Sequence, residues 1–171
     1  MFIKFKEDLS IKEQIEKTVE NLTIYGHLRR YLGGEILIAS LLKDDIGKKA
    51  PLSFKQTLEK FIHASREIGA KPVLITFATK YNINNYKQMT HDEKLWLLRY
   101  NGYLSPKGWI NTVAEFNKII KQTAIENNIP CIDLAKHISG KKDLFTDFVH
   151  FTKNGHKIIG ELLATKIMNI I

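Results

Sequence analysis

Cysteine is scarce in this sequence, and its scarcity excludes several kinds of site. Cys131 is the only cysteine among 171 residues, so no intrachain disulfide can form. No cysteines and histidines have the spacing of a zinc site, and we expect neither a metal nor a cofactor. Cys131 lies in the apolar run Ile129 to Ile132, a setting typical of a small buried hydrophobic residue rather than of a nucleophile.

Long apolar stretches are also missing. Nowhere do about 18 apolar residues follow one another, as a membrane-spanning helix requires. Charged residues enter within the first eight positions, before the core of a signal peptide could form. The sequence as given therefore predicts a cytoplasmic protein without a membrane segment, unless an export signal has been lost from its N-terminal side.

The net charge of +8 is not concentrated in one place. The densest basic pairs lie far apart in the chain, at Arg29-Arg30, Lys48-Lys49 and Lys141-Lys142. Nucleic-acid surfaces combine clustered basic residues with interleaved aromatic ones, so we expect no nucleic-acid partner. Hydrophobic residues make up 44% and charged residues 26%, which predicts one globular domain over residues 1–171.

The order of apolar patterns predicts an α/β fold. Helical spacing is seen at residues 10–21, 53–68, 109–127 and from Thr152 onward, and buried parallel strands are predicted at 71–77 and 129–134. Residues 25–43 fit either a buried helix or a short strand, with helix favoured. Residues 80–108 are polar and aromatic, with one short helix near 92–99, and are predicted to be an insertion or lid-like segment. Alternating strands and helices are typical of a doubly wound sheet.

One short stretch indicates chemistry. Asp147 precedes His150 by three residues, on a loop that follows the second predicted strand and leads to the helix cap at Thr152. At this spacing the carboxylate can accept the imidazole Nδ1 proton, which leaves Nε2 as a base. Ligands of open α/β sheets bind at the carboxyl ends of the strands, where this loop is expected.

Residues from about Phe54 to the C-terminus resemble the second half of the SGNH (GDSL-like) ester hydrolases. The resemblance is carried by Gly69 to Thr76, Phe116-Asn117, the stretch 127–134, and Asp147-x-x-His150 with Thr152 and Gly155. It implies a three-layer flavodoxin-like fold. It also implies that Asp147 and His150 are the acid and base of a Ser-His-Asp triad acting on an ester such as an acylated sugar or a lipid.

The family's nucleophile is missing from the sequence. SGNH enzymes carry their serine in a G-D-S block and an oxyanion-hole asparagine in a G-x-N-D block, and neither string occurs here. Ser40 directly follows an apolar run, which makes it the one internal candidate for the nucleophile. We therefore expect a fold truncated at its N-terminal side and inactive alone. The alternative is a non-catalytic scaffold of the same fold that binds a partner or a polyanion.

Two further expectations depend on this reading. The strand within Pro72 to Phe77 should have an open edge that leads to self-association or needs the missing N-terminal half, unless Glu35 to Leu41 fills it. The aromatic residues of the predicted insertion should either line an acyl or sugar pocket or form a small satellite core: Trp96, Tyr100, Tyr103 and Trp109.

Overall fold

The computed structural model describes residues 42–101 and 104–170. Within these ranges the protein is largely helical with a small parallel sheet, which is compatible with the expected α/β class. The elements in chain order are α3 (Lys49–Glu67), β1 (Leu74–Ile75), the short 3-10 helix η1 (Tyr86–Gln88), α4 (His91–Asn101), α5 (Pro106–Glu126), β2 (Cys131–Ile132), α6 (Leu134–Ile138), the 3-10 helix η2 (Lys142–Leu144) and α7 (Lys153–Met168).

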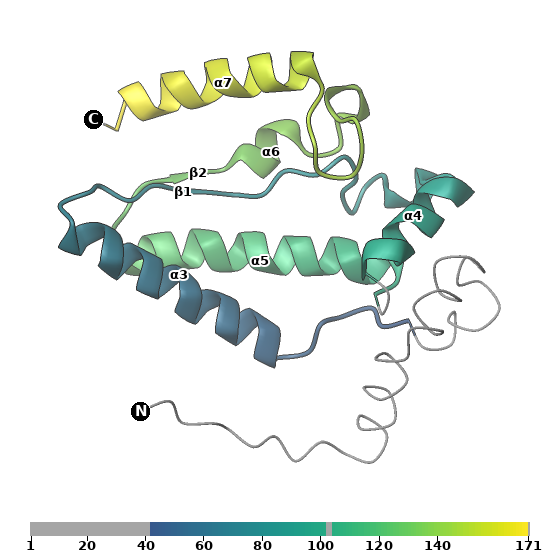
Figure 1. Cartoon of the computed structure of the whole chain (residues 1–171), viewed down its shortest axis with the longest axis horizontal. Helices are drawn as coiled ribbons and strands as arrows, with labels where there is room; N and C mark the ends of the chain where they lie inside the picture. Colours follow the sequence, from purple (N-terminus) through teal and green to yellow (C-terminus); the bar gives the residue numbers. More distant parts are fainter. Residues whose placement is uncertain (1–41, 102–103, 171) are drawn as a thin grey trace.

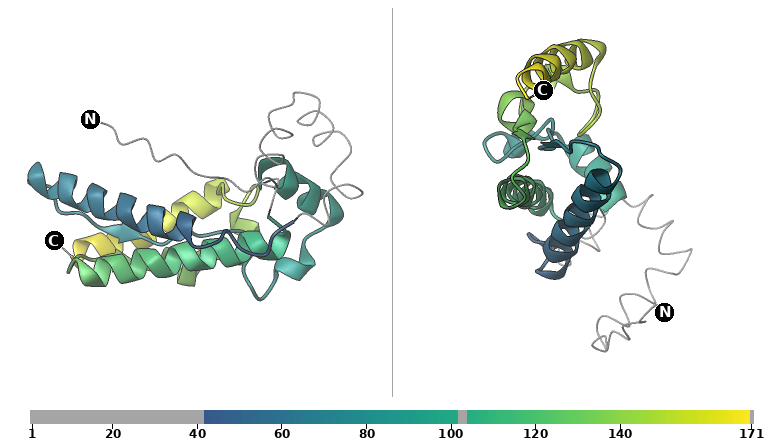
Figure 2. Two further views of the ribbon diagram at one scale, coloured as in Figure 1. Left: turned by 90° about the horizontal axis from the view of Figure 1, so that it is seen from below. Right: turned by 90° about the vertical axis from the view of Figure 1, so that its left-hand side faces the viewer.

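The described elements form layers. Helices α3 and α5 lie on one side of the two strands, and α7 lies on the other (Figures 1 and 2). Ile62 of α3 and Ile120 of α5 pack with Leu74 of β1 in one buried cluster. A second cluster under α7 joins Ile159 to Ala78 and Leu134, which follow the two strands. The sheet is therefore covered on both faces.

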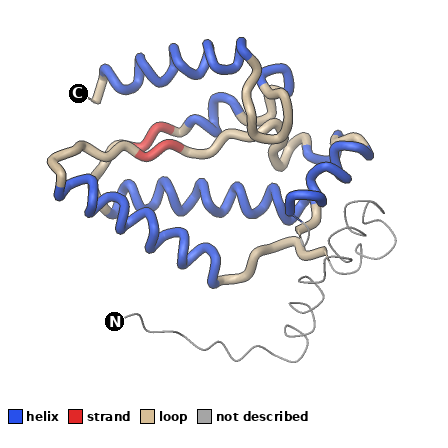
Figure 3. Tube along the Cα trace, in the orientation of Figure 1, coloured by secondary structure: helices blue, strands red, loops and turns tan. Residues whose placement is uncertain are grey.

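The sheet is shorter than the sequence predicts (Figure 3). Leu74 lies opposite Cys131 and Ile75 opposite Ile132 in parallel register. The expected second strand ran to Leu134, but that residue begins α6, because the Asp133 side chain accepts a hydrogen bond from the backbone N–H of Lys136 and caps a helix there.

At the end of β1, one side chain bonds to the strand. The N–H of Phe77 donates to Asn117 Oδ1 at 2.7 Å, and Asn117 Nδ2 donates to the carbonyl of Phe77 at 2.9 Å. Asn117 lies on α5 and is buried. The amide thus satisfies both backbone groups of Phe77.

Helix α3 begins at Lys49 rather than at Ser53, and only part of its predicted inner face is buried. Ile62 is fully buried, whereas Phe61 is 54% and Ile68 82% exposed. Neighbouring helix positions differ by about 100° around the axis, so Phe61 turns away when Ile62 faces α5. Gly69 ends the helix with a φ of 75°, as expected.

Helix α5 also begins earlier than expected. Ser105 is the N-cap, accepting from Gly108 N–H at 2.9 Å, and Pro106 opens the helix. Its inner face is buried or half-buried, and the residues on it are Val113, Phe116, Ile119, Ile120 and Thr123.

The closing helix confirms its predicted cap. Thr152 Oγ1 accepts from the Gly155 N–H at 3.1 Å, and Ile159 is buried one turn later. A Cβ at Gly155 would lie 2.3 Å from the carbonyl oxygen of Leu144, so only glycine permits this helix to start so close to the preceding loop.

Several expectations fall outside the described residues. These are the helix at 10–21, the ambiguous segment up to Leu41, the candidate Ser40, and Tyr103. None of the helices in the described ranges is long and apolar enough to cross a membrane.

Candidate active site

The loop from Leu144 to Thr152 is closed by backbone pairing. Phe145 bridges Phe151 in antiparallel fashion, and Thr152 N–H donates to the carbonyl of Leu144 at 2.9 Å. Thr146 N–H donates to the carbonyl of His150 at 2.9 Å. The narrow loop fixes the positions of the residues at its tip.

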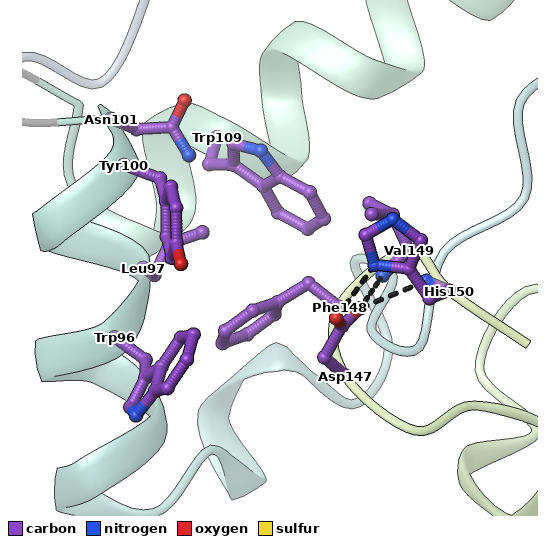
Figure 4. A pocket seen from close by; sticks show the side chains of 9 residues that line it. All are labelled: Trp96, Leu97, Tyr100, Asn101, Trp109, Asp147, Phe148, Val149 and His150. Atoms are coloured by element: carbon purple, nitrogen blue, oxygen red, sulfur yellow. Dashed lines mark hydrogen bonds and ion pairs between the residues drawn. The ribbon is translucent and has the colours of Figure 1, made fainter.

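Asp147 stabilises that tip with both carboxylate oxygens (Figure 4). Its Oδ1 accepts from the N–H groups of Val149 at 2.9 Å and His150 at 2.8 Å, and its Oδ2 lies 2.7 Å from His150 Nδ1. Partial burial works to raise the pKa of Asp147, but these hydrogen bonds outweigh it and hold the pKa below the ordinary 3.8. The group is therefore a carboxylate at neutral pH.

His150 is held at one nitrogen only. Asp147 engages Nδ1, and the second ring nitrogen points away from the carboxylate (Figure 4). The side chain of His150 is 76% exposed. A carboxylate on Nδ1 favours the tautomer with the proton on that nitrogen, so Nε2 is available to accept a proton. The expected contact between the two residues is confirmed.

Phe148 anchors the loop, a role that the sequence reasoning missed. Its carbonyl accepts from Lys80 N–H at 2.9 Å, five residues after β1 ends, which places the loop beside the carboxyl end of that strand. Its ring lies 5.7 Å from that of Trp109 and 6.0 Å from that of Tyr81. In the sequence, phenylalanines at 145, 148 and 151 alternate with Asp147 and His150, and this pattern could have predicted that the loop is anchored by aromatic side chains.

A cavity of about 290 Å³ opens beside the pair. One wall is the loop tip, and the opposite wall comes from α4 and the start of α5. Its lining residues are Trp96, Leu97, Tyr100, Asn101, Trp109, Asp147, Phe148, Val149 and His150. Residues 38 to 54 positions apart in the chain thus meet at one site.

A curated relative supports a relationship to esterases at the family level. Over 133 residues the chain is 26% identical to the probable rhamnogalacturonan acetylesterase YesY of Bacillus subtilis (strain 168), an SGNH hydrolase. The match covers 69% of this chain and 52% of the relative, so the chain spans about half that protein's length. No family model matches the sequence. No solved structure matches it either.

No nucleophile lines the cavity among the described residues. Its lining contains no serine, threonine or cysteine. Ser65 and Ser105 bond to nearby backbone groups, Ser139 accepts from Thr79 N–H, and Ser53 is exposed on α3. Cys131 is half-buried in β2, and burial raises the pKa of its thiol.

Other polar candidates have structural roles. Asp133 accepts from Thr76 Oγ1 at 2.9 Å and caps α6, as expected of a structural residue. The ring of His156 makes an edge contact with that of Phe151, so it touches the loop without facing Asp147. No group of three or more potential metal ligands gathers anywhere in residues 42–101 or 104–170.

Residues Lys43 and Asp44 pack against the start of α5. Lys43 pairs in parallel with Leu104, and its carbonyl accepts from Ser105 N–H at 2.9 Å. A Cβ at Gly108 would lie 2.2 Å from that carbonyl oxygen, so glycine allows the close approach. The Asp44 carboxylate accepts from Ser105 Oγ. These contacts hold the first described residues against the start of α5, at the same end of the molecule as the cavity.

Proposed function

We propose that this chain is the C-terminal part of an SGNH-type ester hydrolase, with Asp147 and His150 as the acid and base of its triad. The single observation that carries the proposal is the 2.7 Å contact between Asp147 Oδ2 and His150 Nδ1, at the mouth of a cavity. The similarity to an acetylesterase and the helices on both sides of a parallel sheet support the same family and its three-layer, flavodoxin-like fold.

The pair's part in catalysis follows from its geometry. A serine hydroxyl from outside the described residues attacks the ester carbonyl while His150 Nε2 takes its proton, and Asp147 stabilises the imidazolium. His150 then returns that proton to the departing alkoxide, so the alcohol leaves and an acyl-serine remains. Water repeats the sequence, releasing the acid and the serine. None of these steps uses a metal or an organic cofactor.

The proposed site is incomplete without further residues. Among the described residues the cavity lining holds no serine, threonine or cysteine, and the high exposure of His150 fits a base that another segment covers in the complete enzyme. Residues 80–108, which supply the facing wall through α4, would serve as the lid-like segment. The substrate would be a small acyl ester of a sugar or a lipid.

The first test is the activity of the chain alone. We expect no labelling by a fluorophosphonate probe and no hydrolysis of aryl acetates above that of His150→Ala, because an acid-base pair without nucleophile and oxyanion donors has nothing to activate. Removing triad members usually costs about 10³-fold or more in rate. Robust turnover that disappears in Ser40→Ala would show that the nucleophile lies in this chain.

The second test supplies the missing blocks. The DNA upstream of Met1 is sequenced, and any polypeptide with G-D-S and G-x-N-D blocks that it encodes is co-expressed with this chain. Turnover should appear, vanish in His150→Ala and persist in His137→Ala, an exposed histidine on α6. Turnover that survives His150→Ala would contradict the assigned base. A native start at Met1 with no such upstream frame would favour the non-catalytic scaffold.

A further inference from the structure

Two aromatic side chains at the cavity mouth are exposed. Trp96 is 48% and Tyr100 74% exposed, with their ring centroids 5.6 Å apart and their planes inclined by 32°. They lie four residues apart on α4 and therefore on one face of it. Leu97 of the same helix is 2% exposed and packs inward. Figure 4 shows both rings on the same wall, facing the loop that carries Asp147.

These rings are not needed for the core beneath them. The buried cluster of this region consists of Tyr81, Met89, Leu97, Leu104, Trp109 and Ile110. Trp109, at 8% exposed, belongs to that core and has only part of its surface on the cavity. Exposed aromatic surface beside a cavity is typical of a binding site rather than of a packing element.

Polar groups surround the aromatic surface. Asp147 and His150 stand opposite it, and Asn101 adds its side-chain amide to the cavity lining. Near Trp96, the charge of Lys80 is already paired with Glu93 at 2.9 Å. Apart from the Asp147 carboxylate, recognition here therefore depends on flat apolar contact and neutral hydrogen bonds.

A sugar ring matches this combination. Its faces are C–H groups, which pack on aromatic rings, and its rim carries hydroxyl groups, which need hydrogen-bonding partners. Ligand clefts measure roughly 300–1,000 Å³. A cavity of about 290 Å³ is large enough for one sugar ring.

We propose that Trp96 and Tyr100 form a saccharide-binding subsite that holds the sugar ring of an acylated carbohydrate, with its ester toward His150. The orientation of the ester rests on the proposed function. The binding of the sugar does not, because it requires no nucleophile.

The experiment is isothermal titration calorimetry on the full chain at 150 mM NaCl with xylotriose, trigalacturonate and octanoate. At least one trisaccharide should bind, and its Kd should weaken about tenfold in both Trp96→Ala and Tyr100→Ala. Trp96→Phe keeps a ring and should restore most of the affinity. Phe61→Ala, which removes an aromatic residue 54% exposed on α3, is the matched control and should change nothing.

Three results would contradict the proposed subsite: no saccharide binds, only octanoate binds, or the saccharide affinity is unchanged in both alanine variants. Trigalacturonate is negatively charged, and it could bind a basic chain by charge attraction alone. Its binding would then be lost at 500 mM NaCl and would be unchanged in both alanine variants, which is the third result. Intact binding together with failed reconstitution of esterase activity would refute the catalytic proposal and leave the subsite standing.

Discussion

At the scale of single residues, Asp147 determines the form of the site. Its carboxylate accepts from two backbone N–H groups and contacts His150 Nδ1, so one side chain both shapes the loop and orients the base. The sequence predicted this pair because the spacing is local. It could not predict the anchoring by Phe148, because its partners Tyr81 and Trp109 come from distant segments.

Replacement of Asp147 by asparagine should change the tautomer of His150. The amide oxygen can still accept from the backbone, but the amide NH₂ cannot accept the Nδ1 proton, so the neutral ring should shift toward the Nε2–H form. Ring ¹⁵N chemical shifts in mildly alkaline buffer measure the change. Asp143→Asn, in η2 just before the loop, is the control. Unchanged shifts in Asp147→Asn would mean that the contact does not set the tautomer.

Glu93 should make stability depend on acid. It accepts from Tyr81 Oη at 2.6 Å and Thr90 N–H at 2.9 Å, and it pairs with Lys80. Burial works to raise its pKa, but these partners lower it from 4.5 to about 2. Because the folded pKa is depressed, the stabilisation is complete above about pH 4.5 and is lost as pH falls toward about 2.

Urea unfolding of Glu93→Gln tests this dependence. The variant should lose about 1–2 kcal/mol at pH 7, and its difference from the wild type should shrink by pH 3. Glu59→Gln is the control, since Glu59 makes only a long i,i+4 contact of 3.9 Å with Lys55 on the surface. A difference that stays constant between the two pH values would contradict the assignment.

At the scale of elements, β1 has an open edge in the described structure. Leu74 and Thr76 donate toward β2, to the carbonyls of Pro130 and Ile132, so the N–H of Ile75 between them points to the other edge. No strand among residues 42–101 and 104–170 pairs there. Ile75 is 37% and Phe77 49% exposed, and both line an apolar groove against α3 and α5.

We expect this edge to make the isolated chain self-associate. Apolar surface left in water forgoes roughly 25 cal/mol per Å², which favours pairing with a second chain. Sedimentation velocity should show a mass that rises with concentration, and Phe77→Lys should reduce it. Ile125→Lys, at a position 73% exposed on α5, should not. A concentration-independent monomer with a cooperative, high-temperature melt would count against the open edge.

The helices were easier to predict than the strands. The apolar spacing of α5 and the Thr152 cap of α7 are local patterns, and both are present as expected. The second strand ends early because Asp133 caps α6 where the strand was expected to continue, and a side-chain cap of this kind leaves no period-two signal. Helix α3 begins at Lys49, four residues before the predicted start at Ser53.

At the scale of the whole molecule, the cavity joins two parts of the chain. The sequence left open whether the aromatic residues of 80–108 and Trp109 form a pocket or a satellite core. The structure separates them, because Trp109 is core and Trp96 and Tyr100 are exposed. Which of these aromatic residues are buried depends on how α4 packs against the Asp147 loop. Composition alone could therefore not predict it.

A completing polypeptide should both stabilise the chain and cover its base. A partner that binds only the folded state raises stability, so the melting temperature should increase with its concentration. Modification of His150 by diethylpyrocarbonate, followed by mass spectrometry, should slow in the complex, since 76% of the side chain is exposed now. His137 serves as the internal control. Equal protection of both histidines would indicate general masking rather than completion of the site.

The amide of Asn117 has a consequence for any strand that joins β1. It occupies both hydrogen-bonding positions of Phe77, so an added strand can pair with Ile75 but must leave the sheet before Phe77. A side chain of α5 thereby limits how far along β1 such a strand can pair. The residues after its last paired position would emerge at the carboxyl edge of the sheet, beside the loop of Asp147 and His150.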